Sequence, residues 1–464
     1  MRRLLLLLLV VSCSSAKDGP SYHSGYKEHW ENVAFTIQET WHLSKVDSST
    51  WQMTGSLNVP YPFMSIKPGR NVLFGWDPYF TNLGLLTVDS LAIYAKNSAD
   101  NQMEEIDQVG YIPNASEPWA LNRSQPPFLA MKVKDVYETI NPGKDWLMQS
   151  YDAIVKEYQF WMDSSETAIE DNTTSIDGLQ RYYHHATDDE LIAFYSQLAP
   201  RFGFSDTIPR SEQIAIGSVW MAEAESGMDF TPRFENRCPD FIPVDLNSNL
   251  YQYEQILSWM VKELDLSDQP DWQMRANKRK VLINQYCWSE ERGMYLDYDF
   301  VNQRHSEVAS SVSFYPLWAG IASREQAQKV RDNLGLIEFE FGPTVCEPTK
   351  QDRHYQWDYP AGWPPLYYIV ASGLEAYGYH EDALRIASKY LDIVTKNYLS
   401  PEPQVYVQTN KKGAEVSITR KPGFVYEKYN VLDGTVNDSE YAGREFQGWS
   451  YGVYMWAYDF VTTK

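Results

Sequence analysis

Long amphipathic segments that come in pairs dominate this 464-residue chain. In each segment an apolar residue returns every three or four positions, the spacing that places such residues on one face of a helix. Three pairs are joined by short polar turns, and they span residues 126–140 with 145–162, 246–266 with 273–288, and 364–378 with 380–399. Consecutive helices with a short connection pack antiparallel. The sequence therefore predicts a mainly α protein built from helical hairpins, with short β segments in its loops.

The chain shows no internal sign of a second folded unit. No Gly/Ser-rich linker or low-complexity stretch interrupts it. Two further helices are expected over residues 324–337 and 443–464. We expect an N-terminal extension over residues 17–60 and one domain over residues 61–464, which is long enough to bury a sizeable core.

The first residues are typical of a secretory signal. Residues 1–16 contain two arginines, then an apolar stretch, then small residues. "SSA", which ends at Ala16, fits a cleavage site, whereas "VVSC" looks like a bacterial lipobox that would place lipid on Cys13. Either processing site predicts a secreted or cell-envelope protein, periplasmic or lipid-anchored.

The composition limits the kinds of ligand and partner that the chain is expected to bind. A formal charge of -22 argues against binding to nucleic acid, because the phosphate backbone is also negative. Sixteen tryptophans and 33 tyrosines supply flat apolar faces with polar edges, which suit either sugar binding or a large aromatic core. The spacing of Cys238, Cys287 and Cys346 fits no zinc motif. We expect a small neutral sugar as ligand, and no metal, cofactor or protein partner is indicated.

Polar and aromatic residues gather in the loops between the expected helices. "QWDYPAGWPP", residues 356–365, combines prolines, two indoles and two polar groups, which suits a rigid cavity wall. Other such loops are "PGRNVLFGWDPYF", "GYIPNASEPWALNRSQPP", "AESGMDFTPRF" and "GFVYEKYNV". Connections of this length are uncommon unless they are functional.

Two carboxyl groups in these loops suit cleavage of a bond between sugars. That chemistry needs one protonated carboxyl for the leaving oxygen and one ionised carboxylate for water or for direct attack. Asp229 follows a glycine turn among apolar residues, where partial desolvation would raise its pKa, as a general acid requires. Glu427 lies between Tyr426 and Lys428. From composition alone, most of the 62 acids are solvated surface groups.

Several motifs resemble the trehalases, glycoside hydrolase family 37. "QWDYPAGWPP" matches the second signature of that family, and "IPN" followed by "LNRSQPP" matches a further hallmark. "ESGMDF" and "EKY" resemble the segments with the catalytic aspartate and glutamate, and the order holds from about residue 60 to 460. The resemblance implies an (α/α)6 barrel, six helical hairpins in a double ring, and inverting hydrolysis of an α-glucosidic bond.

The resemblance also implies roles for residues. Asp229 would be the general acid and Glu427 the general base. The residues expected to bind the sugar or line its pocket are Arg70, Trp76, Asp77, Asn114, Arg123, Gln125, Arg181, Gln356, Trp357, Asp358 and Glu440.

Some segments depart from the family pattern, so alternatives stay open. Met228 stands where trehalases usually have Trp, Tyr183 replaces a glutamate, and the glycine-rich lid before Glu440 is missing. Trehalose is the expected substrate. The alternatives are another α-linked disaccharide or glycoside, of the kojibiose or mannosylglycerate type, and a catalytically inactive sugar-binding protein.

Overall fold

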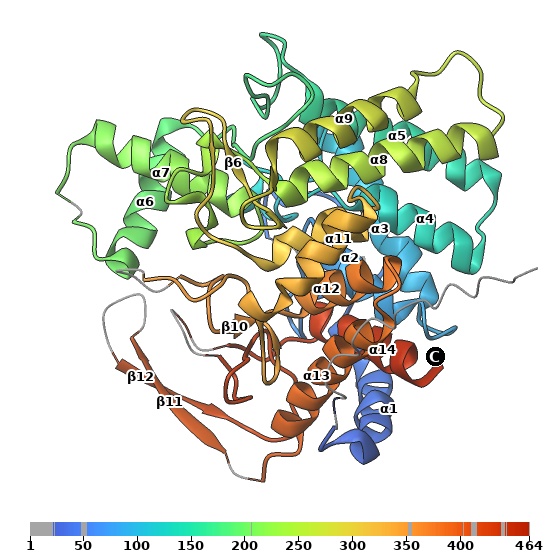
Figure 1. Cartoon of the computed structure of the whole chain (residues 1–464), viewed down its shortest axis with the longest axis vertical. Helices are drawn as coiled ribbons and strands as arrows, with labels where there is room; N and C mark the ends of the chain where they lie inside the picture. The colour runs from blue at the N-terminus through green and yellow to red at the C-terminus, as the bar shows by residue number, and fades with distance from the viewer. Residues whose placement is uncertain are drawn as a thin grey trace, which may run out of the picture.

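The structure is a computed structural model of the whole chain (Figure 1). It describes residues 22, 24–47, 53–205, 207–350, 355–401, 403–409, 415–437, 441 and 443–463. The expected signal peptide and the lipid site at Cys13 lie outside these residues.

Within the described residues, six helices form a closed inner ring in which each packs against the next and the last returns to the first. They are α2 (Asp77–Leu85), α4 (Leu129–Ile140), α8 (Val244–Glu263), α10 (Tyr315–Trp318), α12 (Pro364–Ala376) and α14 (Gly448–Thr463). Helices that alternate with them along the chain are α1 (Trp30–Thr40), α3 (Ala92–Val109), α5 (Lys144–Met162), α9 (Trp272–Tyr286), α11 (Arg324–Asp332) and α13 (His380–Tyr398). This alternation is the architecture of an (α/α)6 barrel.

Burial explains which helix goes where. The inner helix α12 is buried over nearly its whole length and carries almost no charge. Its partner α13 buries one face, which includes Ile386 and Tyr390, and turns polar residues outward. A helix that is apolar all round must lie inside, whereas an amphipathic helix covers it. The three hairpins expected from the sequence each contribute one inner and one outer helix.

A further hairpin lies outside the ring. It consists of α6 (Asp188–Phe202) and α7 (Arg210–Glu225), drawn in green at the left of Figure 1. Its own small core includes Tyr195 and Trp220, whose rings stack with centroids 5.4 Å apart. Helix α7 leads directly into the loop that carries Asp229.

The strands are short and antiparallel, and most hold loops together. The pairs are β1 (Lys45–Val46) with β2 (Phe63–Met64), β4 (Trp288–Ser289) with β5 (Met294–Tyr295), β8 (Glu338–Phe339) with β9 (Gly342–Pro343), β10 (Ala361–Gly362) with β13 (Tyr429–Asn430), and β11 (Gln404–Thr409) with β12 (Glu415–Arg420). A three-stranded sheet orders β3 (Phe241–Ile242), β6 (Tyr298–Asp299) and β7 (Arg304–His305). The β10–β13 pair matters for the site, because it joins two of the polar loops.

The N-terminal extension is packed onto the barrel. Helix α1 contacts α13 and α14, and the indole of Trp30 donates to Asp392 Oδ1 at 2.8 Å. Trp30 and Val33 belong to the main hydrophobic core of the protein. The domain boundary expected at residue 60 remains a prediction. Among the described helices, none combines the length and apolar character needed to span a bilayer.

Candidate active site

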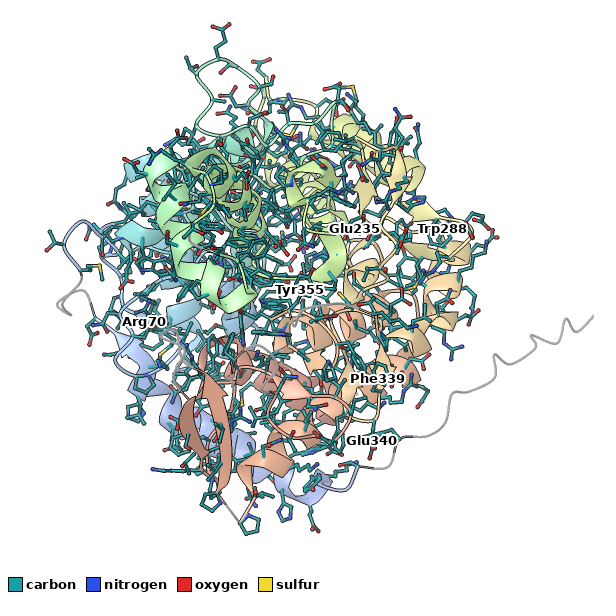
Figure 2. The ribbon with its side chains drawn as sticks, turned by 90° about the vertical axis from the view of Figure 1, so that its left-hand side faces the viewer. Arg70, Glu235, Trp288, Phe339, Glu340 and Tyr355 are labelled. Atoms are coloured by element: carbon teal, nitrogen blue, oxygen red, sulfur yellow. The ribbon has the colours of Figure 1, made fainter. Side chains whose placement is uncertain are left out.

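A cavity of about 390 Å³ opens at the end of the ring where inner helices begin. Trp76 and Asp77 stand at the start of α2, Trp363 immediately precedes α12, and Trp449 lies in the first turn of α14. Its size is in the range of small-molecule sites. In Figure 2, Arg70 and Tyr355 are labelled at the level between the green α6–α7 hairpin and the red β11–β12 hairpin.

Most of the site residues expected from the sequence meet at this cavity. They are Arg70, Trp76, Asp77, Asn114, Arg123, Gln125, Asp229, Gln356, Trp357 and Glu427. They come from five loops that are widely separated in the sequence.

Two expected residues do not line the cavity, and a third lies outside the described residues. Arg181 does not line the cavity, because its guanidinium pairs with Asp171 at 2.7 Å and donates to the carbonyl of Pro239. Asp358 turns into its own loop, where Oδ1 accepts from the backbone N–H of Tyr359, and burial raises its pKa to about 7. Glu440 lies outside the described residues.

Sequence reasoning missed other residues that line the cavity. They are Ile66, Lys67, Phe74, Trp119, Ala224, Gly227, Arg444, Glu445, Phe446 and Trp449, whereas Trp363 belongs to the wall expected from residues 356–365. Trp119 stands in a polar loop already singled out, so its place in that loop was the available signal, whereas Lys67 lies just before the loop that begins at Pro68. Arg444 and Glu445 begin a segment that we expected to be helical, whereas α14 starts only at Gly448.

The loop that carries Asp229 is fixed at several points. The backbone N–H of Thr231 donates to Glu223 Oε1 at 2.7 Å, and that of Trp357 donates to the carbonyl of Phe230 at 2.8 Å. Gly227 has φ +71° and lies against the ring of Trp76, where an added Cβ would come within 2.8 Å. Glycine is needed there for both conformation and space.

A buried ion triad holds the chain just beyond this loop. The guanidinium of Arg233 is fully buried and makes bidentate hydrogen bonds to Asp245 (both 3.0 Å) and Asp297 (3.0 and 2.9 Å). The two carboxylates hold its pKa well above the usual value despite burial. The triad therefore ties the Asp229 segment to α8 and to the 294–300 segment.

Arg233→Met is expected to destabilise the fold by about 3–5 kcal/mol, because it leaves two buried carboxylates without their cation. Urea unfolding checks the change. Arg210→Met is the matched control, since Arg210 pairs on the surface with Asp189 and its loss should cost less than about 1 kcal/mol. Equal destabilisation by the two substitutions would contradict the assigned role of the triad.

Glu427 is positioned by the strand pair and by a tyrosine. Pairing of β10 with β13 brings its segment beside residues 356–363. Tyr441 Oη donates to Glu427 Oε2 at 2.8 Å, and Lys428 Nζ lies 3.9 Å from the centroid of the Tyr441 ring. The backbone N–H of Glu427 donates to the carbonyl of Arg444 at 2.9 Å. One carboxylate oxygen of Glu427 is thereby held in place.

Asp77 is a buried carboxyl of the cavity with a strongly raised pKa. Burial, with smaller contributions from the negative charges of Glu427 and Asp229, raises its pKa to about 8. Those Coulomb interactions indicate that the three carboxyls lie close together. At neutral pH the Asp77 carboxyl is mostly protonated and is able to donate a hydrogen bond.

A pH dependence of stability follows from Asp77. The raised pKa means that the folded state binds a proton that the unfolded state releases, so stability falls as pH rises from about 4 to about 8, by at most about 1.4 kcal/mol per pH unit. We expect Asp77→Asn to lose less stability than the wild type between pH 5 and pH 8. Urea unfolding at both pH values measures this, with the exposed Asp177→Asn as control. Equal losses in wild type and Asp77→Asn would exclude a raised pKa at Asp77.

Stacked indoles form the wall predicted from "QWDYPAGWPP". Trp357 stacks on Trp363 with centroids 3.8 Å apart and planes 10° apart, and Trp449 meets both edge-on. Within the described chain, the buried Nε1–H groups of these three tryptophans have no hydrogen-bond partner. Unpaired buried donors cost free energy, so a ligand oxygen that accepts from one of them would be favoured.

The loop with Asn114 is braced against the start of α2. The backbone N–H of Asn114 donates to the carbonyl of Arg123, and Arg123 Nη2 donates to Asn114 Oδ1 at 3.3 Å. Gln125 Oε1 accepts from the backbone N–H of Trp76 at 3.0 Å. The polar side chains are thus held in fixed positions, which suits recognition of a small polar ligand. Within the described residues, no group of three or more His, Cys, Asp or Glu side chains is arranged so that it could hold a metal ion.

Comparison with known proteins gives a consistent result. The trehalase family profile matches residues 20–461. The cytosolic neutral trehalase of Kluyveromyces lactis is 32% identical over 437 residues, which cover 84% of this chain and 54% of the relative. That of Neurospora crassa is 32% identical over 441 residues, covering 83% and 56%. The chain spans about half the length of these relatives.

Solved structures show the same architecture. The neutral trehalase of Saccharomyces cerevisiae superposes with a TM-score of 0.66 at 27% identity, covering 86% of this chain and 73% of the other. A family 63 mannosylglycerate hydrolase from Thermus thermophilus gives a TM-score of 0.58 at 17% identity, covering 93% and 100%. The predicted (α/α)6 fold is confirmed.

The prediction of a secreted or cell-envelope location is wrong. It rested on the first 16 residues, whereas the relatives from Kluyveromyces lactis and Neurospora crassa are named cytosolic enzymes. A short apolar stretch behind two arginines matched the pattern of a signal peptide, and that pattern alone did not establish export.

Proposed function

We propose that this chain, which belongs to the trehalase family, is an inverting glycoside hydrolase. Its substrate is trehalose, which it cleaves into two glucose molecules. One observation carries the proposal: Asp229 and Glu427, from loops about 200 residues apart, line the same cavity. Their joint effect on the pKa of Asp77 supports their proximity.

Binding would use the polar residues of the inner cavity. Asn114, Arg123 and Gln125 present amide and guanidinium groups that suit sugar hydroxyls. The protonated carboxyl of Asp77 adds a donor, and the indole of Trp357 adds a flat face for sugar C–H groups. Trehalose is small and neutral, and a cavity of about 390 Å³ suits it.

In the reaction, Asp229 gives its proton to the glycosidic oxygen as the bond from this oxygen to the anomeric carbon breaks. Glu427 takes a proton from a water molecule, whose oxygen attacks that carbon from the opposite face. Inverting geometry calls for roughly 6.5–9.5 Å between the two carboxyl groups to hold this water. The products are one β-glucose and one α-glucose, and proton exchange with solvent restores both carboxyls.

Proton NMR of a trehalose digest tests the proposal. The expected result is early appearance of β-glucose beside α-glucose, before mutarotation mixes them. Release of α-glucose alone would overturn the inverting mechanism. Cleavage of kojibiose or mannosylglycerate without trehalose would reassign the substrate, and silence on every α-linked disaccharide would favour a sugar-binding protein.

A further inference from the structure

We propose that the outer part of the cavity is a subsite for an anionic leaving group, so that the enzyme accepts α-glucosides whose second half carries a phosphate or a carboxylate. The inference deepens the proposed function and rests on it. Its basis is a set of cationic side chains, Lys67, Arg70 and Arg444, that line the cavity and are less buried than its indole wall.

Exposure separates an inner part from an outer part. Trp76, Trp357 and Trp363 are almost fully buried. By contrast, Trp119 is 45% exposed and Arg444 is exposed, although both line the same cavity. We place the leaving half of a sugar whose anomeric carbon meets Asp229 and Glu427 in this more exposed part, which Trp119 and the cations line.

Backbone contacts place Lys67 and Arg444 on adjoining segments. The carbonyl of Ile66 accepts from the backbone N–H of Gln447 at 2.7 Å and from that of Gly448 at 3.2 Å. Lys67 follows Ile66 directly, and Arg444 stands three residues before Gln447. These contacts join the two segments that carry the cations, although the segments are far apart in the sequence.

Two of these cations, Lys67 and Arg444, have no acidic partner among the described residues. In the described part of the chain, neither Lys67 nor Arg444 makes an ion pair. Arg70 does pair, with Glu117 Oε2 at 3.3 Å, and the same oxygen accepts from Trp119 Nε1 at 2.5 Å. Glu117 therefore fixes a guanidinium and an indole at the rim, whereas no described acid pairs with Lys67 or with Arg444, whose guanidinium carbon lies 5.4 Å from the centroid of the Tyr441 ring.

The charges of the cavity favour an anion. The groups involved are the cations Lys67, Arg70, Arg123 and Arg444, and the acids Asp77, Asp229, Glu427 and Glu445. Burial raises the pKa of Asp77 to about 8, and Asp229 must be protonated to act as the acid, so two of the four acids are neutral before reaction. Among the described residues the cavity lining is then net positive, and it stays so when Glu117, the partner of Arg70, is counted, whereas the chain has a formal charge of -22. A positive cavity in an acidic protein attracts anionic substrates selectively.

The test compares three substrates that share an α-glucosyl group: trehalose, trehalose 6-phosphate and α-glucosylglycerate. We expect at least one anionic substrate to equal or exceed trehalose in kcat/KM, with a preference that weakens as salt is added. In Lys67→Gln and Arg444→Gln, the ratio of kcat/KM for that substrate to kcat/KM for trehalose should fall about tenfold. Lys278→Gln, which removes a surface cation paired with Asp177, is the control and should leave the ratio unchanged.

The outcomes separate this proposal from the proposed function. Cleavage of trehalose with no cleavage of either anionic substrate, or a ratio that no variant changes, overturns the anionic subsite and leaves the hydrolase intact. If no substrate is cleaved, the hydrolase fails, and calorimetry on the wild type decides the subsite. The anionic subsite is supported if the wild type binds an anionic compound more tightly than trehalose and Lys67→Gln loses this difference. Equal binding of the two compounds by the wild type overturns the subsite. The two anionic substrates distinguish phosphate from carboxylate.

Discussion

Asp229→Asn is expected to lower kcat on trehalose by about three orders of magnitude, within the range for loss of a general acid. The amide has nearly the same shape, but it has no proton to give to the glycosidic oxygen. Asp229 lines the cavity at the end of a loop that Glu223 and Trp357 hold, so the substitution should leave the backbone in place. Initial-rate kinetics with trehalose measure the loss, and the exposed Asp177→Asn serves as control.

A substrate with a different leaving group makes the test specific. Fluoride departs without protonation, so α-glucosyl fluoride does not need the acid. We expect Asp229→Asn to keep most of the wild-type rate on α-glucosyl fluoride while losing it on trehalose. Equal losses on both substrates would assign Asp229 a role in binding or folding instead.

Glu427→Gln is expected to lower kcat by about three to four orders of magnitude on both substrates, because water must be activated whichever group leaves. Tyr441 Oη still finds an oxygen acceptor in the amide, so the geometry should persist. Glu325→Gln, on the surface of α11, is the matched control. Substantial turnover of the fluoride by Glu427→Gln would remove Glu427 as the base.

The opposite responses of the two variants to one substrate identify the two carboxyls. Both variants should bind trehalose, which calorimetry detects, since the inner polar residues are unchanged. Reversed responses, with Glu427→Gln active on the fluoride and Asp229→Asn inactive, would exchange the roles. That result would keep the site but reverse the proposed direction of proton transfer.

The helices with clear apolar periodicity could be predicted from the sequence. Helices α4, α5, α8, α9, α12 and α13 appear within a few residues of their expected bounds. Helix α2 was missed, and "FGWDPYF" was read as loop only. Every side of this short helix is largely buried, so it shows no amphipathic pattern to detect. The α6–α7 hairpin was also missed. It packs around a small core of its own, and the apolar residues of α7 show only a weak helical periodicity.

Within the site, residues in motifs rich in aromatic and polar groups could be predicted from the sequence. Residues that line the cavity but belong to no such motif could not. Trp76, Asn114 and Trp357 stand in motifs that combine aromatic and polar groups. Lys67 and Arg444 have no such motif, and only the contact between Ile66 and the 447–448 backbone brings them together. Arg181 shows the reverse case: its sequence position suggested the pocket, and an ion pair with Asp171 holds it elsewhere.

The sequence by itself determined the helical hairpins, the aromatic cavity wall and two carboxyls suited to hydrolysis. These are local properties, since periodicity, proline and motif order lie within short stretches of chain. Only the tertiary structure decided that the ring closes from α14 to α2, that Asp77 is buried beside the charges of Asp229 and Glu427, and that cations collect at the cavity rim. The reason is physical: burial and Coulomb interactions depend on distances between residues far apart in sequence, and those distances exist only once the ring has closed.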